Sequence, residues 1–343
     1  MSETVLSWPD FLAGQGASPV PGGSPDALAF SLPDDTQQGF LCPLTHLGVI
    51  SATGDDAENF LHNQLSNDVL GLGNDRAHLA GYCSPKGRLL ATMLIWKDGG
   101  DILLALPREL LPATMKRLQM FVLRAKVRLE DASERLPLFG VAAAAGTQAA
   151  FPPAAWQRRP AEGGTLVRVP DAAGLQRALW AGPLHAAATA WTHYAGALPA
   201  APASLWRWTE ILAGVPQVVE ATREQFVPQM INFELVGGVN FRKGCYPGQE
   251  IVARSQYLGK LKRRALLAFD DSGNAVAGAE VFADADPGQP CGMIVNAERG
   301  ADGRKACLVE LKMDAAGTPV HIGSADGPLL SFGELPYPLS AAE

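Results

Sequence analysis

The residues that offer the most chemistry lie close together between positions 237 and 254. This stretch reads Gly-Gly-Val-Asn-Phe-Arg-Lys-Gly-Cys-Tyr-Pro-Gly-Gln-Glu-Ile-Val-Ala-Arg and combines four glycines, a proline, a thiol and three cations. Glycine permits backbone conformations and close approaches that other residues do not. A segment that serves packing alone seldom needs so many such positions, so we expect a functional site here.

Cys245 is the candidate reactive group of this stretch. Pro247 suits the first turn of a helix, and residues 249–254 are good helix formers, so the thiol is expected just before a helix N-terminus. The positive helix end and the cations Arg242 and Lys243 would favour its thiolate form. The alternative is a tight turn in which the cysteine is a small buried hydrophobic residue, and the residues alone leave both open.

Other common catalytic and metal-binding patterns are missing from the sequence. It has no nucleophile elbow, zinc-protease motif or phosphate loop, and Gly71-Leu72-Gly73 lacks the third glycine of a dinucleotide fingerprint. The five cysteines form no C-x-x-C pair and the six histidines have no metal-ligand spacing, so we predict no metal site. A Cys–His enzyme built on Cys245 stays open, although no histidine is assigned to it.

Length and composition predict a soluble protein of two or three domains. The chain has 343 residues, 47% of them hydrophobic and 18% charged. Its net charge of −7 argues against a general nucleic-acid or membrane-surface binder. The first residues lack the pattern of an export signal, and the most apolar run, 89–96, is too short to span a bilayer. An odd number of cysteines suits a reducing compartment, so we expect a cytoplasmic location.

A cluster of cations nevertheless spans 23 residues near the cysteine, with only Glu250 opposing it. Its members are Arg242, Lys243, Arg254, Lys260, Lys262, Arg263 and Arg264. One interpretation is a solvated strand or loop whose charges keep an edge soluble. The other is a site for an anion, either a carboxylate-rich ligand or a phosphate backbone.

The first part of the chain predicts a mostly antiparallel α+β sheet. Residues 1–35, rich in Gly, Pro, Ser and Asp, are expected to be an irregular leader. Asp55 and Glu58 have capping-box spacing before a short helix, and an amphipathic helix is expected between Leu111 and Val122. Apolar and β-branched runs predict strands over 47–51, 78–83, 88–97, 102–106 and 126–130.

The rest of the chain predicts a small α+β unit, a helix and a β-rich end. Strand-like runs at 138–141, 165–169 and 178–181 precede a helix over 185–194. Another helix begins at Ser204 and places Glu210 among apolar and aromatic residues. Such a glutamate usually points to water, and the other interpretation is a carboxylate that faces a pocket. Short strands after residue 260 predict an antiparallel barrel or sandwich.

Residues 243–250, Lys-Gly-Cys-Tyr-Pro-Gly-Gln-Glu, closely resemble the Lys-Gly-Cys-(Phe/Tyr)-x-Gly-Gln-Glu signature of the YgfZ family. These are folate-binding proteins related to the aminomethyltransferase (T-protein) of the glycine cleavage system. Residues 60–69, 206–216 and 226–232 also resemble segments of the family. The resemblance spans roughly 40–330 and is weakest in the middle.

The resemblance implies an α+β, three-domain aminomethyltransferase-like fold around a central opening that holds a tetrahydrofolate. After the leader at 1–35, the folate-binding domain would be discontinuous, over 36–134 and 204–260. A ferredoxin-like domain would occupy 135–203, and an antiparallel β-barrel would occupy 261–343.

The resemblance also implies site residues. Glu210 would read the pterin, because a carboxylate accepts two adjacent N–H groups in fork geometry. Tyr82 or Tyr246 would stack on the ring system, and cations near 242–264 would attract the glutamate tail. The full set of implied cofactor-binding residues is Glu210, Tyr82, Asn67, Asn232, Tyr246, Gln249 and Arg254. Cys245 would be the reactive thiol, and Lys243 would stabilise its thiolate.

The leading hypothesis from the resemblance is a folate-binding accessory protein for iron–sulfur cluster assembly or repair. Its partners would be iron–sulfur enzymes or assembly factors, and it would act on tRNA modification indirectly, through enzymes such as methylthiotransferases. A second hypothesis is a folate-dependent aminomethyl- or methyltransferase. T-proteins carry an aspartate at the hairpin turn that reads Cys-Ser-Pro-Lys-Gly-Arg at 83–88 here, so glycine-cleavage activity is disfavoured. A third is an RNA-binding module that uses the cations at 242–264.

Overall fold

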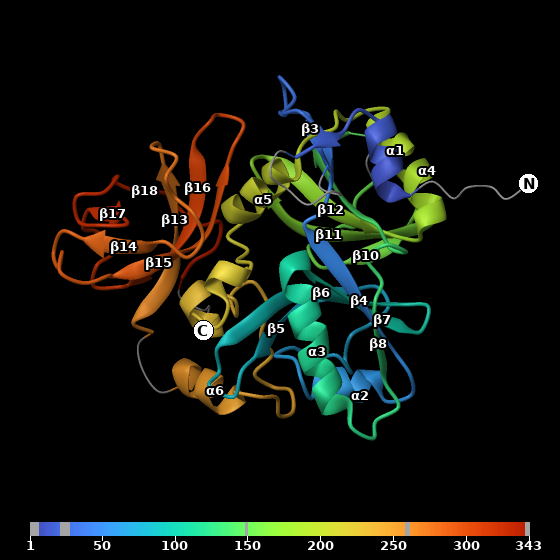
Figure 1. The fold of residues 1–343 in the computed structure, drawn as a ribbon, viewed down its shortest axis with the longest axis horizontal. Helices are drawn as coiled ribbons and strands as arrows, with labels where there is room; N and C mark the ends of the chain where they lie inside the picture. The colour runs from blue at the N-terminus through green and yellow to red at the C-terminus, as the bar shows by residue number, and fades with distance from the viewer. Residues whose placement is uncertain (1–6, 21–27, 148–149, 258–260, 340–343) are drawn as a thin grey trace, which may run out of the picture.

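The computed structural model describes residues 7–20, 28–147, 150–257 and 261–339. Its strands form three large antiparallel sheets, which Figure 1 shows at the bottom, upper right and upper left of the view. A short pairing of β1 (Ser18–Pro19) with β2 (Leu28–Ala29) lies apart from them. The mixed, mostly antiparallel α+β architecture predicted from the sequence is confirmed.

The first sheet has the strand order β5-β6-β7-β4-β8. Its strands are β4 (Leu47–Thr53), β5 (Ala77–Cys83), β6 (Leu89–Asp98), β7 (Asp101–Pro107) and β8 (Arg128–Asp131). Helix α2 (Ala57–His62) follows β4, and η1 (Arg108–Leu110) leads into α3 (Leu111–Val122). The predicted Asp55–Glu58 capping box does not form, because Asp56 is the N-cap of α2 and its carboxylate instead accepts from the Lys126 backbone N–H at 2.7 Å.

The middle sheet has the order β10-β11-β12-β9-β3. Its strands are β3 (Gly39–Pro43), β9 (Leu138–Ala144), β10 (Arg158–Ala161), β11 (Gly164–Ala172) and β12 (Leu175–Ala181). Strand β3 precedes the first sheet in the sequence but pairs with β9, so this early segment belongs to the middle sheet. Helices α1 (Trp8–Gly14) and α4 (Leu184–Ala195) pack beside it (Figure 1).

The expectation of an irregular leader is wrong for part of it. Ser7 caps α1 by accepting from the Asp10 backbone N–H at 3.2 Å, and Pro9 occupies the first turn of the helix. Trp8 and Leu12 are buried against Phe139 and Trp191. Burial of these large side chains holds the leader on the middle sheet despite its glycine and proline content.

Alternation along the strands gives the middle sheet two apolar faces. Phe139 and Val141 of β9 belong to the core under α1 and α4, whereas Leu175 and Leu179 of β12 belong to the core shared with the first sheet. Because side chains of a strand point to opposite faces with period two, Arg177 lies on the face of Leu175 and Leu179. A guanidinium is therefore placed between two sheets.

The third sheet has the order β17-β14-β15-β16-β13-β18. Its strands are β13 (Arg263–Asp270), β14 (Glu280–Ala283), β15 (Gly292–Arg299), β16 (Lys305–Lys312), β17 (Val320–Ile322) and β18 (Ser331–Phe332). The chain between the two edge strands bonds β17 through Ile322 N–H to Pro328 O and Leu330 N–H to Val320 O, both 2.9 Å. The sheet therefore curls towards closure, in agreement with the predicted barrel.

The remaining elements join the three sheets. Helix α5 (Ala203–Leu212) lies between the middle and third sheets in Figure 1. It is followed by η2 (Glu220–Thr222), η3 (Pro228–Ile231) and α6 (Gln249–Tyr257), which lies beside the first sheet. None of the helices in the described ranges is long and apolar enough to cross a membrane.

Candidate functional site

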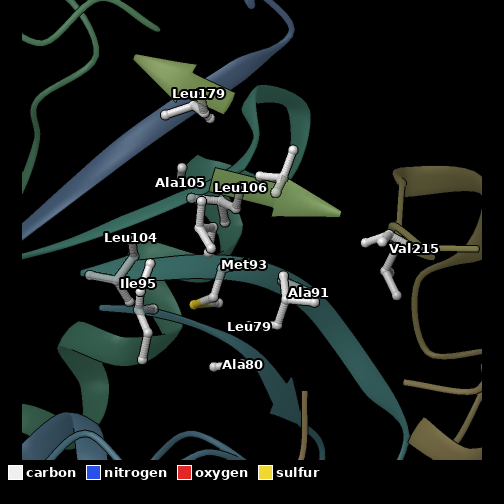
Figure 2. Close-up of a cluster of buried hydrophobic side chains, with 14 of the residues drawn as sticks. Leu79, Ala80, Ala91, Met93, Ile95, Leu104, Ala105, Leu106, Leu179 and Val215 are labelled. Carbon is white, nitrogen blue, oxygen red and sulfur yellow. The ribbon is translucent and has the colours of Figure 1, made fainter. Parts of the chain in front are cut away.

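A pocket with a cavity volume of about 50 Å³ lies where the first and middle sheets meet α5. Figure 2 shows Met93 and Ala105 on the first sheet, Leu179 on β12 and Val215 on the loop after α5. Trp156 and Trp206 add aromatic walls. Its mostly apolar lining with a few polar groups is typical of a small-molecule site. At this volume the pocket holds water-sized molecules, so a ring-sized ligand requires its walls to move apart.

Glu210 of α5 lines this pocket, as the pocket-facing interpretation requires. The Trp206 indole N–H donates to Glu210 Oε1 at 3.1 Å, one helical turn away. Within the described part of the chain, Oε2 accepts no hydrogen bond. Burial raises the pKa of Glu210, and the charge of Arg177 opposes that rise. The carboxyl group is thus anchored on one side and free to bind a ligand on the other.

Arg177 is a polar group of the pocket that the sequence reasoning missed. It is fully buried, donates from Nη1 to Thr209 Oγ1 at 2.8 Å and from Nε to Pro170 O at 2.9 Å, and stacks on Trp206 at 4.9 Å. Burial lowers its pKa to about 10. Its position between Leu175 and Leu179 on one face of an apolar strand is the sequence signal that could have identified it.

The loop of residues 243–250, here called the signature loop, does not line the Glu210 pocket. Cys245 is exposed, which excludes the buried, purely packing interpretation of its thiol. Helix α6 begins at Gln249, two residues beyond Pro247, so the thiol is further from the helix end than predicted. Gly248 has φ +80° and packs against the turn between β5 and β6, where an added Cβ would meet Ser84 O at 2.4 Å.

Lys243 points back into the protein. Its ammonium donates to the carbonyls of His62, at the end of α2, and of Leu65, the latter at 2.8 Å, and it lies 4.9 Å from the centre of the Tyr246 ring. Burial lowers its pKa to about 8, and the charges of Asp68 and Cys245 oppose that shift. The described contacts therefore give Lys243 the role of fastening the signature loop to the end of α2.

We expect Lys243→Met to destabilise the protein by about 1–2 kcal/mol, because two partly buried carbonyl acceptors lose a charged donor. Urea denaturation followed by circular dichroism measures this change. Cys245→Ala is the matched control from the same loop and should leave the unfolding midpoint within error. An unchanged midpoint in Lys243→Met would contradict the fastening role.

Tyr82 and Tyr246 lie outside the lining of the Glu210 pocket. Both side chains are buried, and among the described residues neither hydroxyl has a hydrogen-bond partner. Burial raises the pKa of Tyr82 and of Tyr246. In this arrangement neither ring is positioned to stack on a ligand held by Glu210.

Asn67 and Asn232 are bonded to the backbone of the protein itself. Asn67 Nδ2 donates to Leu79 O at 2.6 Å and to Gly237 O at 2.7 Å, which ties β5 to the start of the glycine-rich stretch. Asn232 adopts a left-handed conformation, φ 59°, and its Nδ2 donates to Ala265 O at 2.8 Å. Both side chains thus hold backbone segments of the protein in place, and neither lines the Glu210 pocket.

The predicted cation cluster does not form one basic surface. Arg263 donates to both carboxylate oxygens of Glu310, at 2.8 and 2.7 Å, and Arg264 is buried against Glu234. Arg254 forms an exposed pair with Glu250 at 2.9 Å on α6, and Gln249 lies beside it at the start of that helix. Arg242 and Lys262 are exposed, and Lys260 lies outside the described residues. Much of the charge expected to attract RNA or a glutamate tail is thus neutralised.

The structure therefore separates the predicted site residues into two places. Glu210 lies in the pocket between the sheets with Arg177, Trp156 and Trp206. Cys245 lies on the exposed signature loop. Ligand recognition and thiol chemistry would occur at different positions in the fold.

Comparisons with known proteins agree with this architecture. The chain is 31% identical to the tRNA-modifying protein YgfZ of Colwellia psychrerythraea over 226 residues, which cover 65% of this chain and 69% of that protein. It is 28% identical to the Klebsiella pneumoniae protein of the same name, covering 88% and 94%. No protein-family model matches the chain.

Among solved structures, the aminomethyltransferase T of the Bartonella henselae glycine cleavage system superposes with a TM-score of 0.75 at 14% identity. The match covers 97% of this chain and 98% of that one, so the whole fold is shared. The level of identity to the Colwellia protein over most of its length extends the agreement from fold to family. This chain belongs to the YgfZ family.

Proposed function

We propose that this protein binds a tetrahydrofolate in the Glu210 pocket and acts in tRNA modification as an accessory protein for iron–sulfur cluster assembly or repair. Relatives named tRNA-modifying proteins support the tRNA part. The shared fold of an aminomethyltransferase supports the folate part. The iron–sulfur part extends the family resemblance of residues 243–250.

The observation that carries the folate proposal is a buried, unsatisfied guanidinium nitrogen in a pocket that a carboxylate also lines. Arg177 Nη2 is buried without a partner among the described residues, and Glu210 lines the same pocket. Leaving a buried charged group unpaired is costly unless a ligand or water satisfies it. The groups therefore fit a planar, polar-edged ligand between aromatic walls.

In this proposal the residues of the chain bind and orient the ring. Glu210 accepts the adjacent N–H groups of the pterin edge, and Trp206 holds the carboxylate in position. The apolar walls exclude water and cover the ring faces. When bound, the tetrahydrofolate supplies a reduced pterin that can carry one-carbon groups.

Cys245 is proposed as the reactive thiol. Its exposure on the signature loop lets it contact a partner protein directly. One thiol supplies one ligand or one persulfide sulfur, so any cluster it touches needs further ligands from that partner. Aminomethyl transfer is not favoured as a second function, because the turn at 84–87 reads Ser-Pro-Lys-Gly and offers no carboxylate.

Thermal denaturation with tetrahydrofolate tests the folate part. Ligand at 100 times its Kd should stabilise the native protein by about 2.7 kcal/mol, which appears as a higher Tm. A Tm that does not move at any ligand concentration would argue against a folate site.

Complementation tests the thiol part. In cells that lack the chromosomal copy, Cys245→Ala should fail to restore methylthio-modified tRNA, measured by mass spectrometry of nucleosides. Cys291→Ala, at a buried cysteine just before β15, is the matched control and should restore it. Full restoration by a folded Cys245→Ala protein would rule out the proposed thiol role.

A further inference from the structure

Two oppositely charged side chains face one pocket without meeting each other. Arg177 comes from β12 and Glu210 from α5, and within the described chain they form no ion pair, although each influences the charge of the other. Each is held by other partners. Thr209 and Pro170 O fix the guanidinium, and the Trp206 indole fixes the carboxylate.

The remaining atoms of the two groups make a fixed donor and acceptor pattern. Arg177 Nη2 is a buried donor without a partner in the described residues, whereas Glu210 uses Oε1 for its hydrogen bond from Trp206. Because stacking on Trp206 also restrains the guanidinium, it cannot turn towards Glu210 without losing two hydrogen bonds. The pocket thus presents both an acceptor and a donor to whatever enters it.

The edge of an oxidised or reduced pterin has the complementary order. Its 2-amino group and N3–H are adjacent donors, and the 4-oxo group next to them is an acceptor. Glu210 would take the two donors, and Arg177 Nη2 would donate to the oxygen. A 4-amino ring instead places the N–H groups of its amino substituent opposite Arg177. Two hydrogen-bond donors then face each other, and neither has an acceptor.

We propose that Arg177 is a specificity-determining residue that, with Glu210, selects 4-oxo over 4-amino pterins. This inference rests on the proposed folate site. Because an unpaired buried donor opposes binding, wild-type protein should prefer tetrahydrofolate over its reduced 4-amino analogue by about 10- to 100-fold in Kd.

Calorimetric titration with both compounds tests the inference, at a pH where both rings are neutral. In Arg177→Met the preference should fall to within about threefold, and in Arg177→Lys, which keeps a cation, part of it should remain. Arg168→Met is the matched control. Arg168 is buried in the same sheet but donates to Asp171 at 2.7 Å and does not line the pocket, so its replacement should leave the preference intact.

The possible failures are distinguishable. Wild-type protein that binds both compounds equally would overturn the role of Arg177 and leave the folate site standing. An Arg177→Met variant that lowers the affinity for both compounds by the same factor would show that Arg177 has a structural role only. So would a variant in which a bridging water takes the place of the guanidinium. Wild-type protein that binds neither compound would overturn the proposed function together with this inference.

Discussion

Replacing Glu210 by Gln is expected to weaken tetrahydrofolate binding by about 100-fold, equivalent to roughly 3 kcal/mol. The amide keeps the shape of the side chain and one acceptor oxygen, but its NH₂ group would face the donors of the pterin edge. The charge-assisted hydrogen bonds of the carboxylate are also lost. Equilibrium dialysis against tetrahydrofolate measures the change.

The matched control for this variant is Glu298→Gln. Glu298 pairs with Arg207 of the same helix at 2.6 Å but does not line the pocket. Its replacement should leave the affinity within about threefold, since no contact to the ligand changes. Equal losses in both variants would mean that α5 had shifted and that Glu210 has no direct contact.

The affinity of wild-type protein should also depend on pH. Burial raises the pKa of Glu210, and only the ionised carboxylate accepts two N–H groups. The affinity for tetrahydrofolate should therefore be highest at high pH. It should begin to fall at a pH above the usual pKa of a glutamate. Glu210→Gln should lack this dependence.

The second large effect is expected for Arg264→Met, which should destabilise the protein by about 3–5 kcal/mol. The Arg264 and Glu234 side chains are 8% and 4% exposed and form an ion pair between β13 and the segment after η3. Arg264 also donates to Gln229 O at 3.0 Å. Its removal leaves a carboxylate buried without its counter-charge, and this penalty is large.

The pH dependence of this destabilisation has a definite sign. Burial raises the pKa of Glu234 and Arg264 opposes that rise, so the variant should have a still higher pKa. When folding raises the pKa of an acidic group, the folded protein loses stability as the pH rises through that raised pKa. The deficit of Arg264→Met, from urea denaturation, should thus be larger at pH 8 than at about pH 5. Arg128→Met, in an exposed pair with Glu130, is the control and should change stability by less than about 1 kcal/mol.

Local patterns in the sequence predicted most of the elements correctly. The strands of the first and third sheets and helices α3 and α4 follow alternation and apolar periodicity. The leader was misjudged because glycine and proline dominate its composition. Ser7, Pro9 and Asp10 nevertheless give an N-cap, a first-turn proline and a first-turn acid, which are the local signals of a helix start.

The site was only partly predictable, for a physical reason. Glu210 was visible as a carboxylate in an apolar helix, and its segment resembles the family. The partners of Lys243 lie 178 and 181 residues away in the sequence, so no local pattern could show that its ammonium binds the end of α2. The prediction of a basic surface was wrong for the same reason. Glu310 and Glu234 come close to Arg263 and Arg264 only through the tertiary fold.

The central claim is that a tetrahydrofolate binds between the first and middle sheets, with its pterin on Glu210. An X-ray structure of the protein crystallised with tetrahydrofolate tests this most directly. We expect a ring in the pocket of Trp156 and Trp206, with pterin nitrogens about 2.7–3.2 Å from the Glu210 carboxylate. A pterin bound elsewhere, for example at the signature loop, with the pocket closed or filled by water, would contradict it.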